Sequence, residues 1–295
     1  MKRRKSRAGR VKGLRGGNAD SRSPLFHSSP LSLFASLLLV SSLLLSGACK
    51  RNTEQALEHA REAWDSGDYG AAAEEYERYL ERNPTGEKSL QARFQLANIY
   101  YLNLHRLDQA RSHYSEFLKE DPSHPEAHTA RERLAEVLGE LGRSYDAVAE
   151  YENLNPQDAG ERRRIRLRIA DLYFDQKNYS QALTEYEKVI EGADHDELSE
   201  QAYMREASIY NARNQYQLSL VVYQKLAALS NNAEARQRAT YGMADCYAGL
   251  FKFDEAIKTL REIKDERENE HIAQRIAELE QQKREAAQAR TGLNQ

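Results

Sequence analysis

The chain has 295 residues with a formal net charge of −3, and 30% of its residues are charged. Residues 1–30 hold nine Lys or Arg and one acid, so the rest of the chain carries a net charge of −11. An acidic body argues against nucleic-acid binding, because that function needs a basic surface along the phosphate backbone. Runs that alternate apolar and polar residues over strand lengths are missing, so the composition predicts an all-α chain.

The N-terminal part of the sequence has the pattern of an export signal. Residues 1–30 are basic and rich in Ser and Gly, and residues 31–48 form an uncharged apolar stretch that ends directly before Cys49. A basic segment followed by an apolar one is typical of the start of exported proteins. The alternative for residues 1–30 is a basic nucleic-acid arm, and a later start codon at Val11 would shorten this segment.

Three interpretations of residues 31–49 remain open. In the first, a lipoprotein signal is cleaved before Cys49, which then carries the lipid; Leu-Ser-Gly-Ala-Cys resembles a lipobox with its leucine one position early. In the second, ordinary cleavage follows Ala48 in the small-residue run Ser46-Gly47-Ala48. In the third, the segment stays as a membrane anchor, since its length is just below the ~20 residues that cross a bilayer. All three place the body of the protein outside the cytoplasm.

The two cysteines fit the lipoprotein interpretation. An exported protein normally pairs its thiols in disulfides, but Cys49 lies at the signal boundary and Cys246 falls within a predicted helix. Lipidation accounts for Cys49, and burial as a small hydrophobic side chain accounts for Cys246.

From about residue 53 onward, one sequence unit recurs. A small residue is followed four positions later by an aromatic or a leucine, and successive units are 38, 37, 35, 37 and 37 residues apart. The pairs are Ala72/Tyr76, Ala110/Tyr114, Ala147/Tyr151, Ala182/Tyr186, Ser219/Tyr223 and Ala256/Leu260. A fixed period of this size predicts stacked helical hairpins, in which the small residues lie where two helices touch.

In these recurring small and aromatic positions, the sequence resembles the tetratricopeptide repeat family. It also shares with that family the residues Gly67-Asp68-Tyr69 and Pro84. The resemblance implies an all-α, right-handed superhelix of about six antiparallel helix hairpins. Three features depart from the family: the period exceeds the ~34 residues of the standard repeat, Asn98 stands where a small residue is expected, and the last three units lack the proline. The predicted parts are 1–30 (basic, disordered), 31–49 (signal), 50–267 (repeat array) and 268–290, a capping helix with Ile272, Ile276 and Leu279 inward.

The sequence contains no recognisable catalytic set, and we predict neither an enzyme nor a cofactor. His124 and His128 have the four-residue spacing of metal ligands on a helix, but Pro125 keeps His124 out of helical geometry and no third ligand is near. We therefore predict no metal site. Seventeen tyrosines fall mostly in the repeat columns, which predicts a core role for them.

The expected functional surface is the groove lined by the first helix of each hairpin. Trp64 and Phe174 occupy equivalent positions outside the packing columns, so they are candidate anchors for a bound peptide or helix. The alternative is that a neighbouring repeat, or the segment near Cys49, buries them. By the family's register, the predicted groove residues are Leu57, Arg61, Trp64, Gln95, Ile99, Leu102, Leu167, Asp171, Phe174, Met204 and Tyr241.

The lipobox-like segment, Tyr100-Tyr101 and Pro122-Ser123-His124-Pro125 together resemble the BamD-type lipoproteins of outer-membrane protein assembly. That resemblance implies a lipid-anchored, periplasm-facing outer-membrane scaffold whose partners are envelope proteins such as barrel-assembly components. A pilus-assembly lipoprotein, a Tol-Pal-associated repeat protein and a soluble secreted adaptor or spacer are the alternatives. An enzyme that carries repeats belongs to another class, and nothing catalytic is left once the repeats are assigned.

Overall fold

The computed structural model describes residues 54–191, 196–263 and 269–292. The predicted basic segment, the signal segment and Cys49 lie outside these residues. All regular structure within the described ranges is helical. The prediction of an all-α chain of stacked hairpins is therefore confirmed for this part of the protein.

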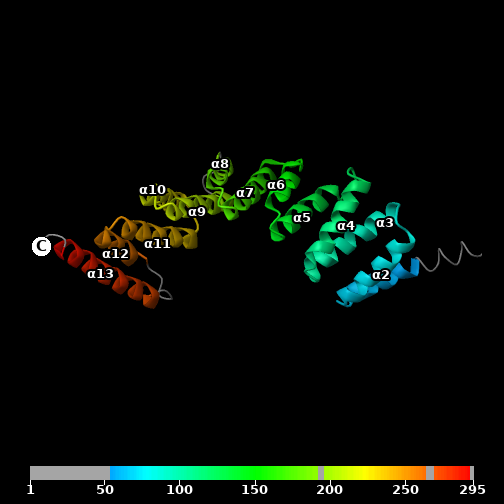
Figure 1. The fold of residues 1–295 in the computed structure, drawn as a ribbon, viewed down its shortest axis with the longest axis horizontal. Coiled ribbons are helices and arrows are strands. Elements are labelled where there is room, and N and C mark those ends of the chain that lie inside the picture. The colour runs from blue at the N-terminus through cyan, green and yellow to red at the C-terminus, as the bar shows by residue number, and fades with distance from the viewer. Residues whose placement is uncertain (1–53, 192–195, 264–268, 293–295) are drawn as a thin grey trace, which may run out of the picture. The chain divides into compact units, whose positions relative to one another are not determined.

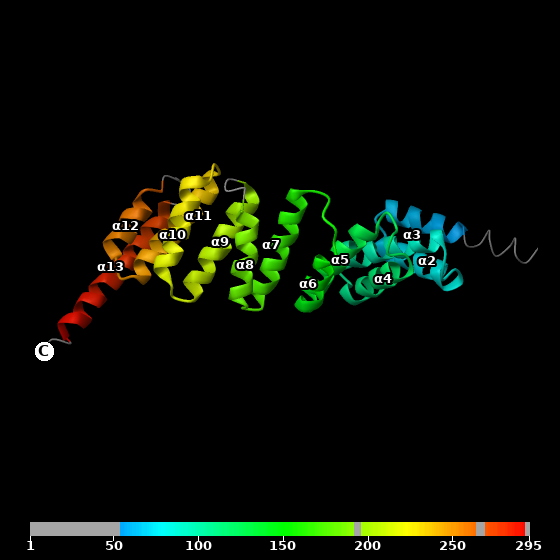
Figure 2. The same ribbon diagram turned by 90° about the horizontal axis from the view of Figure 1, so that it is seen from above.

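In the part of the chain that the structure describes, consecutive helices pair into hairpins that follow one another in chain order (Figures 1 and 2). The first three hairpins are 54–65 with α2 (Tyr69–Arg82), α3 (Glu87–Asn98) and η1 (Ile99–Asn103) with α4 (Leu107–Glu120), and α5 (Ala127–Glu140) with α6 (Ser144–Glu152). The next three are α7 (Ala159–Asp175) with α8 (Tyr179–Ile190), α9 (Glu197–Ala212) with α10 (Tyr216–Leu229), and α11 (Ala233–Gly249) with α12 (Phe253–Arg261). Helix α13 (Asn269–Gly292) follows and packs on α12.

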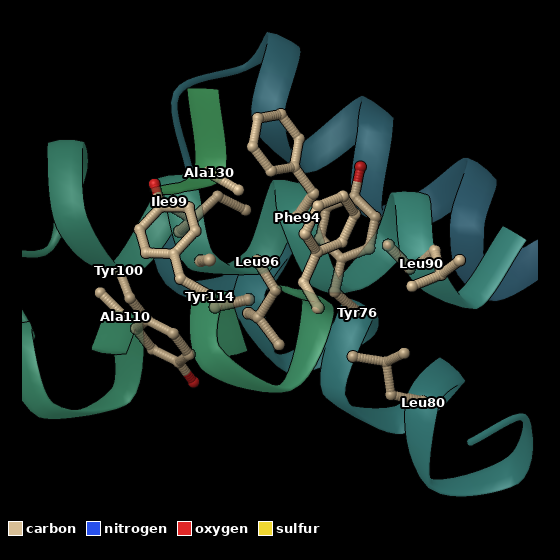
Figure 3. Packing of buried hydrophobic residues seen from close by; sticks show 14 of the residues in the cluster. Tyr76, Leu80, Leu90, Phe94, Leu96, Ile99, Tyr100, Ala110, Tyr114 and Ala130 are labelled. Carbon is tan, nitrogen blue, oxygen red and sulfur yellow. The ribbon is translucent and has the colours of Figure 1, made fainter. Parts of the chain in front are cut away.

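The repeated small residues lie at the helix contacts, as predicted. Each of the six is fully buried, and the residue four positions later is buried with it. Figure 3 shows this packing in the N-terminal hairpins, where Tyr76, Leu96 and Tyr114 belong to one buried cluster and the ring of Phe94 lies edge-on to Tyr114, with centroids 6.2 Å apart. A small residue lets two helix backbones approach, and the large side chains then fill the space beside the contact at crystal-like density.

Asn98, the departure from the small-residue column, connects two hairpins through hydrogen bonds. Its side chain is buried, and its Oδ1 accepts a hydrogen bond from the Tyr114 hydroxyl at 2.6 Å and another from Arg133 of α5. A buried amide without such partners would be costly, so the two donors explain how the larger polar residue is tolerated here.

The turn inside each hairpin uses one residue in the left-handed region. The six residues, with φ between 50° and 81°, are Gly67, His105, Gly142, Lys177, Asn214 and Phe251. Each lies two positions before the second helix. In five turns the next amide donates to a carbonyl five residues back, the bond that ends a helix in a Schellman motif. In the second hairpin the corresponding hydrogen bond spans six residues, from the Arg106 amide to the Tyr100 carbonyl, because the first helix of this hairpin ends in a π-helical turn.

We expect Lys177→Gly to stabilise the protein. Lys177 is exposed and has φ of 58°, where a side chain costs roughly 1–2 kcal/mol. Glycine removes that strain but adds freedom to the unfolded chain, so the expected net gain is about 0.5–1 kcal/mol. The urea midpoint should rise accordingly. Gly142→Ala is the matched opposite change in the third hairpin, and it should lower the midpoint. Equal midpoints for both variants would contradict this account of the turns.

The last helix covers apolar surface of the sixth hairpin. Ile272 and Leu279 of α13 are buried against Phe253 and Leu260 of α12, and Ile276 is partly buried beside them. The helix continues to Gly292, past the predicted end at residue 290. Because α13 covers apolar side chains of the sixth hairpin, it does for that hairpin what a neighbouring unit does elsewhere.

Candidate protein-binding groove

Three cavities open along the first helices of the hairpins. The N-terminal cavity, of about 320 Å³, lies beside Trp64 between the first two hairpins. The middle cavity, of about 440 Å³, lies between Tyr101, α5 and α7. The C-terminal cavity, of about 570 Å³, lies across α7, α9 and α11, and it shares Asp171 and Arg205 with the middle cavity. First helices supply most of the lining, since second helices face the opposite side of each hairpin.

Four predicted groove residues line the N-terminal cavity: Leu57, Arg61, Trp64 and Gln95. Arg61 and Gln95 are exposed, whereas Leu57 and Trp64 are half-buried against the core of the first hairpins. The indole of Trp64 packs edge-on against Tyr69, with ring centroids 5.4 Å apart. Trp64 is thus fixed by its own hairpin, while it still lines the cavity.

Three further predicted residues line the C-terminal cavity: Leu167, Asp171 and Met204. Asp171 is held from two sides, because the Tyr186 hydroxyl donates to its Oδ1 at 2.7 Å and Arg205 Nε lies 3.2 Å from the same atom. Burial, followed by the hydrogen bond to Asp171, raises the pKa of Tyr186 well above its usual range. The tyrosine therefore stays a neutral donor and fixes the carboxylate in the groove.

Phe174 lies outside the linings of the three cavities. Its ring packs against Tyr179, at 5.9 Å between centroids, and the guanidinium of Arg205 lies 5.1 Å above it. Trp64 has no arginine on its face among the cation–π contacts found in the described residues. Two positions that the repeat makes equivalent thus have different surroundings, since Arg205 comes from the next hairpin.

Ile99 and Leu102 correct the predicted groove. Ile99 is fully buried in the core, and Leu102 is 57% exposed but lines none of the three cavities. Both belong to the π-helical segment η1 (Ile99–Asn103). A π-helical turn holds more residues than an α-helical one, so a register counted in α-helical steps assigns side chains to the wrong face there.

Tyr241, the last predicted groove residue, lies near α13. It is half-buried, packs against the core of the last hairpin and lies edge-on to His271, 6.0 Å away between ring centroids. It lines none of the three cavities. The predicted position is therefore partly covered by α13.

Several charged residues that line the cavities are absent from the predicted groove residues. They include Glu136, Arg168, Arg205, Glu197, Glu234 and Arg238. Apart from Arg61, Gln95 and Asp171, the predicted groove positions are apolar, because the repeat was followed in its apolar columns. The 37-residue period runs through the polar positions as well, in the pairs Arg168/Arg205, Glu197/Glu234 and Gln201/Arg238. That repetition was the available signal.

The histidines and the remaining cysteine have structural surroundings. His124 is buried beside Phe117 and pairs with Glu126, whereas His128 pairs with Glu161 at 2.6 Å. Within the described ranges no three side chains are grouped as metal ligands would be. Cys246 is fully buried, and burial raises the pKa of its thiol, which opposes formation of the reactive thiolate. Its predicted packing as a small hydrophobe is confirmed.

The geometry defines a helical repeat protein whose first helices line a groove, and comparison with known families specifies the class. Three tetratricopeptide repeat models match residues 63–134, 167–234 and 238–269, which together exceed half of the chain. The chain is a tetratricopeptide repeat protein. Repeats of this family typically act as protein-interaction scaffolds, and none of the three matches is to a catalytic family.

Solved structures show the same fold. A tetratricopeptide repeat protein from Parabacteroides merdae is 20% identical, with a TM-score of 0.52 over 72% of this chain and 78% of that one. The C-terminal part of a repeat protein from Cytophaga hutchinsonii is 16% identical, with a TM-score of 0.53 over 70% of this chain and 79% of that one. No curated protein matches the sequence. None of the helices in the described ranges is both long enough and apolar enough to cross a bilayer.

Proposed function

We propose that this protein is a cell-envelope scaffold that holds partner proteins in its groove and is tethered to the outer membrane by a lipid on Cys49. The observation that carries the binding role is the N-terminal cavity, where a tryptophan already fixed by its own hairpin lines an open hollow of about 320 Å³. A tryptophan held in place loses little side-chain entropy when a partner covers it, which is why such residues dominate binding energies.

The surroundings of Trp64 suit an apolar side chain of a partner. Leu57 and Ala92 supply apolar walls, and Arg61, Lys88 and Gln95 form a polar rim. An apolar anchor inside a polar rim is the usual anatomy of a protein-binding hot spot, since the rim excludes water from the centre.

Trp64→Ala should abolish most of the binding of partner proteins at the N-terminal cavity. A photo-crosslinking amino acid in place of the exposed Gln95 reports on occupancy, and the same group at the exposed Glu74 of α2 reports on the outer side. We expect adducts from position 95 only. Trp64→Ala should reduce them at least about 10-fold, because hot-spot truncations cost about 2 kcal/mol or more.

Tyr145→Ala is the matched control, since Tyr145 is an aromatic that is 73% exposed outside the three cavities. It should leave the adducts unchanged, and circular dichroism should show full helix content in both variants. Equal adducts from positions 95 and 74, or no effect of Trp64→Ala, would show that the cavity is not the binding site.

The membrane anchor rests on the sequence around Cys49. The cysteine follows an uncharged apolar segment and three small residues, and Lys50 after it favours the outer membrane by resemblance to other lipoproteins. A diacylglycerol with an N-acyl chain gives stable anchoring, because each buried methylene contributes ~0.8 kcal/mol and one chain alone is marginal.

Cys49→Ser should abolish lipidation, so the protein should appear in the soluble periplasmic fraction or remain as a precursor. Mass spectrometry of the mature N-terminus and membrane fractionation measure this. Cys246→Ser is the control, because the buried thiol takes no part in processing. An unmodified Cys49 thiol in the wild-type protein, or a chain that still begins upstream of residue 31, would refute the anchor.

The proposed pathway is outer-membrane protein assembly, supported by the resemblance to BamD-type lipoproteins described above. Affinity purification of the anchored protein from detergent-solubilised membranes tests it. Recovery of a barrel-assembly protein, and its loss with Trp64→Ala, is the expected result. Recovery of a pilus secretin or of Tol-Pal proteins would assign the scaffold to one of those systems instead.

A further inference from the structure

The middle and C-terminal cavities adjoin each other at a shared pair of lining residues, and we call the two together the acidic groove. They share Asp171 and Arg205, and together they extend from α5 to α11. The lining also includes three apolar side chains, those of Leu167, Leu172 and Met204, so the acidic groove offers apolar as well as charged contacts. A lined hollow of this size can seat several side chains of one polypeptide segment.

Carboxylates outnumber cations in the acidic groove. The middle cavity holds Glu136, Glu140, Asp171 and Asp175, and the C-terminal cavity adds Glu197, Glu200 and Glu234. The linings contain only three arginines, Arg168, Arg205 and Arg238. Seven acids against three arginines leave an excess of negative charge.

The three arginines do not balance the excess negative charge of the acidic groove. Arg205 pairs with Asp171 at 3.2 Å, and Arg238 pairs with Glu234 at 2.6 Å. Within the described chain, no Lys or Arg forms an ion pair with Glu136, Asp175, Glu197 or Glu200. Glu200 is buried and accepts a hydrogen bond from the Ser230 hydroxyl, whereas Glu136, Asp175 and Glu197 remain available to a cationic group from outside the chain.

Glu136 is the clearest example of a carboxylate whose negative charge is not balanced by a neighbouring Lys or Arg. It is half-buried, and this burial raises the pKa of its carboxyl group despite the positive field of Arg168. The Tyr101 hydroxyl lies 3.3 Å from Glu136 and 3.0 Å from Glu140. One hydroxyl has one proton, so it can donate to only one of the two carboxylates at a time. A cation placed between them would lower the electrostatic energy of both.

We infer that the acidic groove binds a partner segment rich in Lys or Arg, with the cationic side chains facing Glu136, Asp175 and Glu197. This rests on the proposed role as a protein-binding scaffold and specifies the chemistry of the partner. Charge complementarity also disfavours a second copy of this chain as the occupant, because the body beyond residue 30 has a net charge of −11.

A peptide-binding measurement tests the inference. Every described helix lies within residues 54–292, so a chain of residues 50–295 keeps the whole array. The probes are two fluorescent 12-residue peptides with three Lys-Ala-Leu-Lys repeats or three Glu-Ala-Leu-Glu repeats, titrated by fluorescence anisotropy. The Lys peptide should bind at least about 10-fold more tightly, and its affinity should fall as salt is raised, since exposed charges are screened.

A matched pair of triple variants separates the groove from the general charge of the body. Glu136→Gln with Asp175→Asn and Glu197→Gln should weaken Lys-peptide binding at least about 10-fold, as three opposed charges are lost. Glu74→Gln with Glu187→Gln and Glu255→Gln makes the same charge change at exposed positions of α2, α8 and α12. This control should change the affinity by less than about 2-fold, as expected for charges distant from the ligand.

Equal losses in the two triple variants would overturn the inference, because binding would then follow net charge alone. No binding of the Lys peptide, with the Trp64-dependent crosslinks at position 95 intact, would refute the inference and leave the proposed scaffold role standing. Lys-peptide binding without crosslinks at position 95 would refute the N-terminal cavity as a binding site and leave the acidic groove standing. If the full chain binds the peptide at least about 10-fold more weakly than residues 50–295, the chain's own basic residues 1–30 are the occupant and the assignment to a partner is wrong.

Discussion

Ala182→Trp should disrupt the fourth hairpin and lower the stability of the whole array. Ala182 has no exposed surface, and it lies in the core cluster of α7 and α8 with Ala170 and Tyr186. Inserting even a few methylenes into a packed core costs about 1–3 kcal/mol. An indole is much larger, so we expect a loss of at least about 3 kcal/mol, which for one repeat interface is enough to unpair the hairpin.

Thermal and urea unfolding followed by circular dichroism measure this effect. Because a repeat array is stabilised by contacts between neighbours, the variant should unfold in two steps or at a much lower midpoint. Ala149→Trp is the control, since Ala149 is an exposed alanine on the second helix of the third hairpin. An unchanged transition for Ala182→Trp would mean that the small-residue column does not mark the helix contacts.

Gly242→Ala should destabilise the protein although alanine favours helices. Gly242 is buried inside α11, and an added Cβ would lie 2.3 Å from Cζ of Tyr223 and within 2.6 Å of two further ring carbons. The tyrosine is itself buried, so its ring has little room to move. Alanine gains about 1 kcal/mol over glycine within a helix, but overpacking costs about 1–3 kcal/mol, and at this distance we expect a net loss of about 2 kcal/mol.

Two further variants show whether the ring is the cause. Gly70→Ala, at an exposed position of α2 where the nearest atom to an added Cβ is 3.6 Å away, should be neutral or stabilising by up to about 1 kcal/mol. Tyr223→Leu removes the ring, so adding Gly242→Ala to it should cost much less than in the wild-type protein. Additive effects of the two substitutions would contradict a direct clash.

The sequence was sufficient to predict the core residues of each hairpin, but it did not predict all of the residues that line the groove. Ala182 and its equivalents were found because helix–helix contacts repeat every 35–38 residues and need small side chains. The groove positions Leu57, Arg61 and Trp64, which the resemblance to tetratricopeptide repeats implied, line one cavity together with Gln95. In the next hairpin the register fails at Ile99 and Leu102, because a π-helical turn leaves no mark in the apolar pattern.

The sequence by itself determined the all-α class, the repeat period and the residues at the helix contacts, because these depend on local periodicity that each unit carries within itself. Only the tertiary structure decided which side chains meet between units. It placed Arg205 over Phe174, Asn98 between Tyr114 and Arg133, and Tyr223 against Gly242. It also brought the acids of α5, α7 and α9 to one groove. Such contacts join residues of different helices. The period along the chain marks which positions recur, but it does not specify which side chains meet each other between two hairpins.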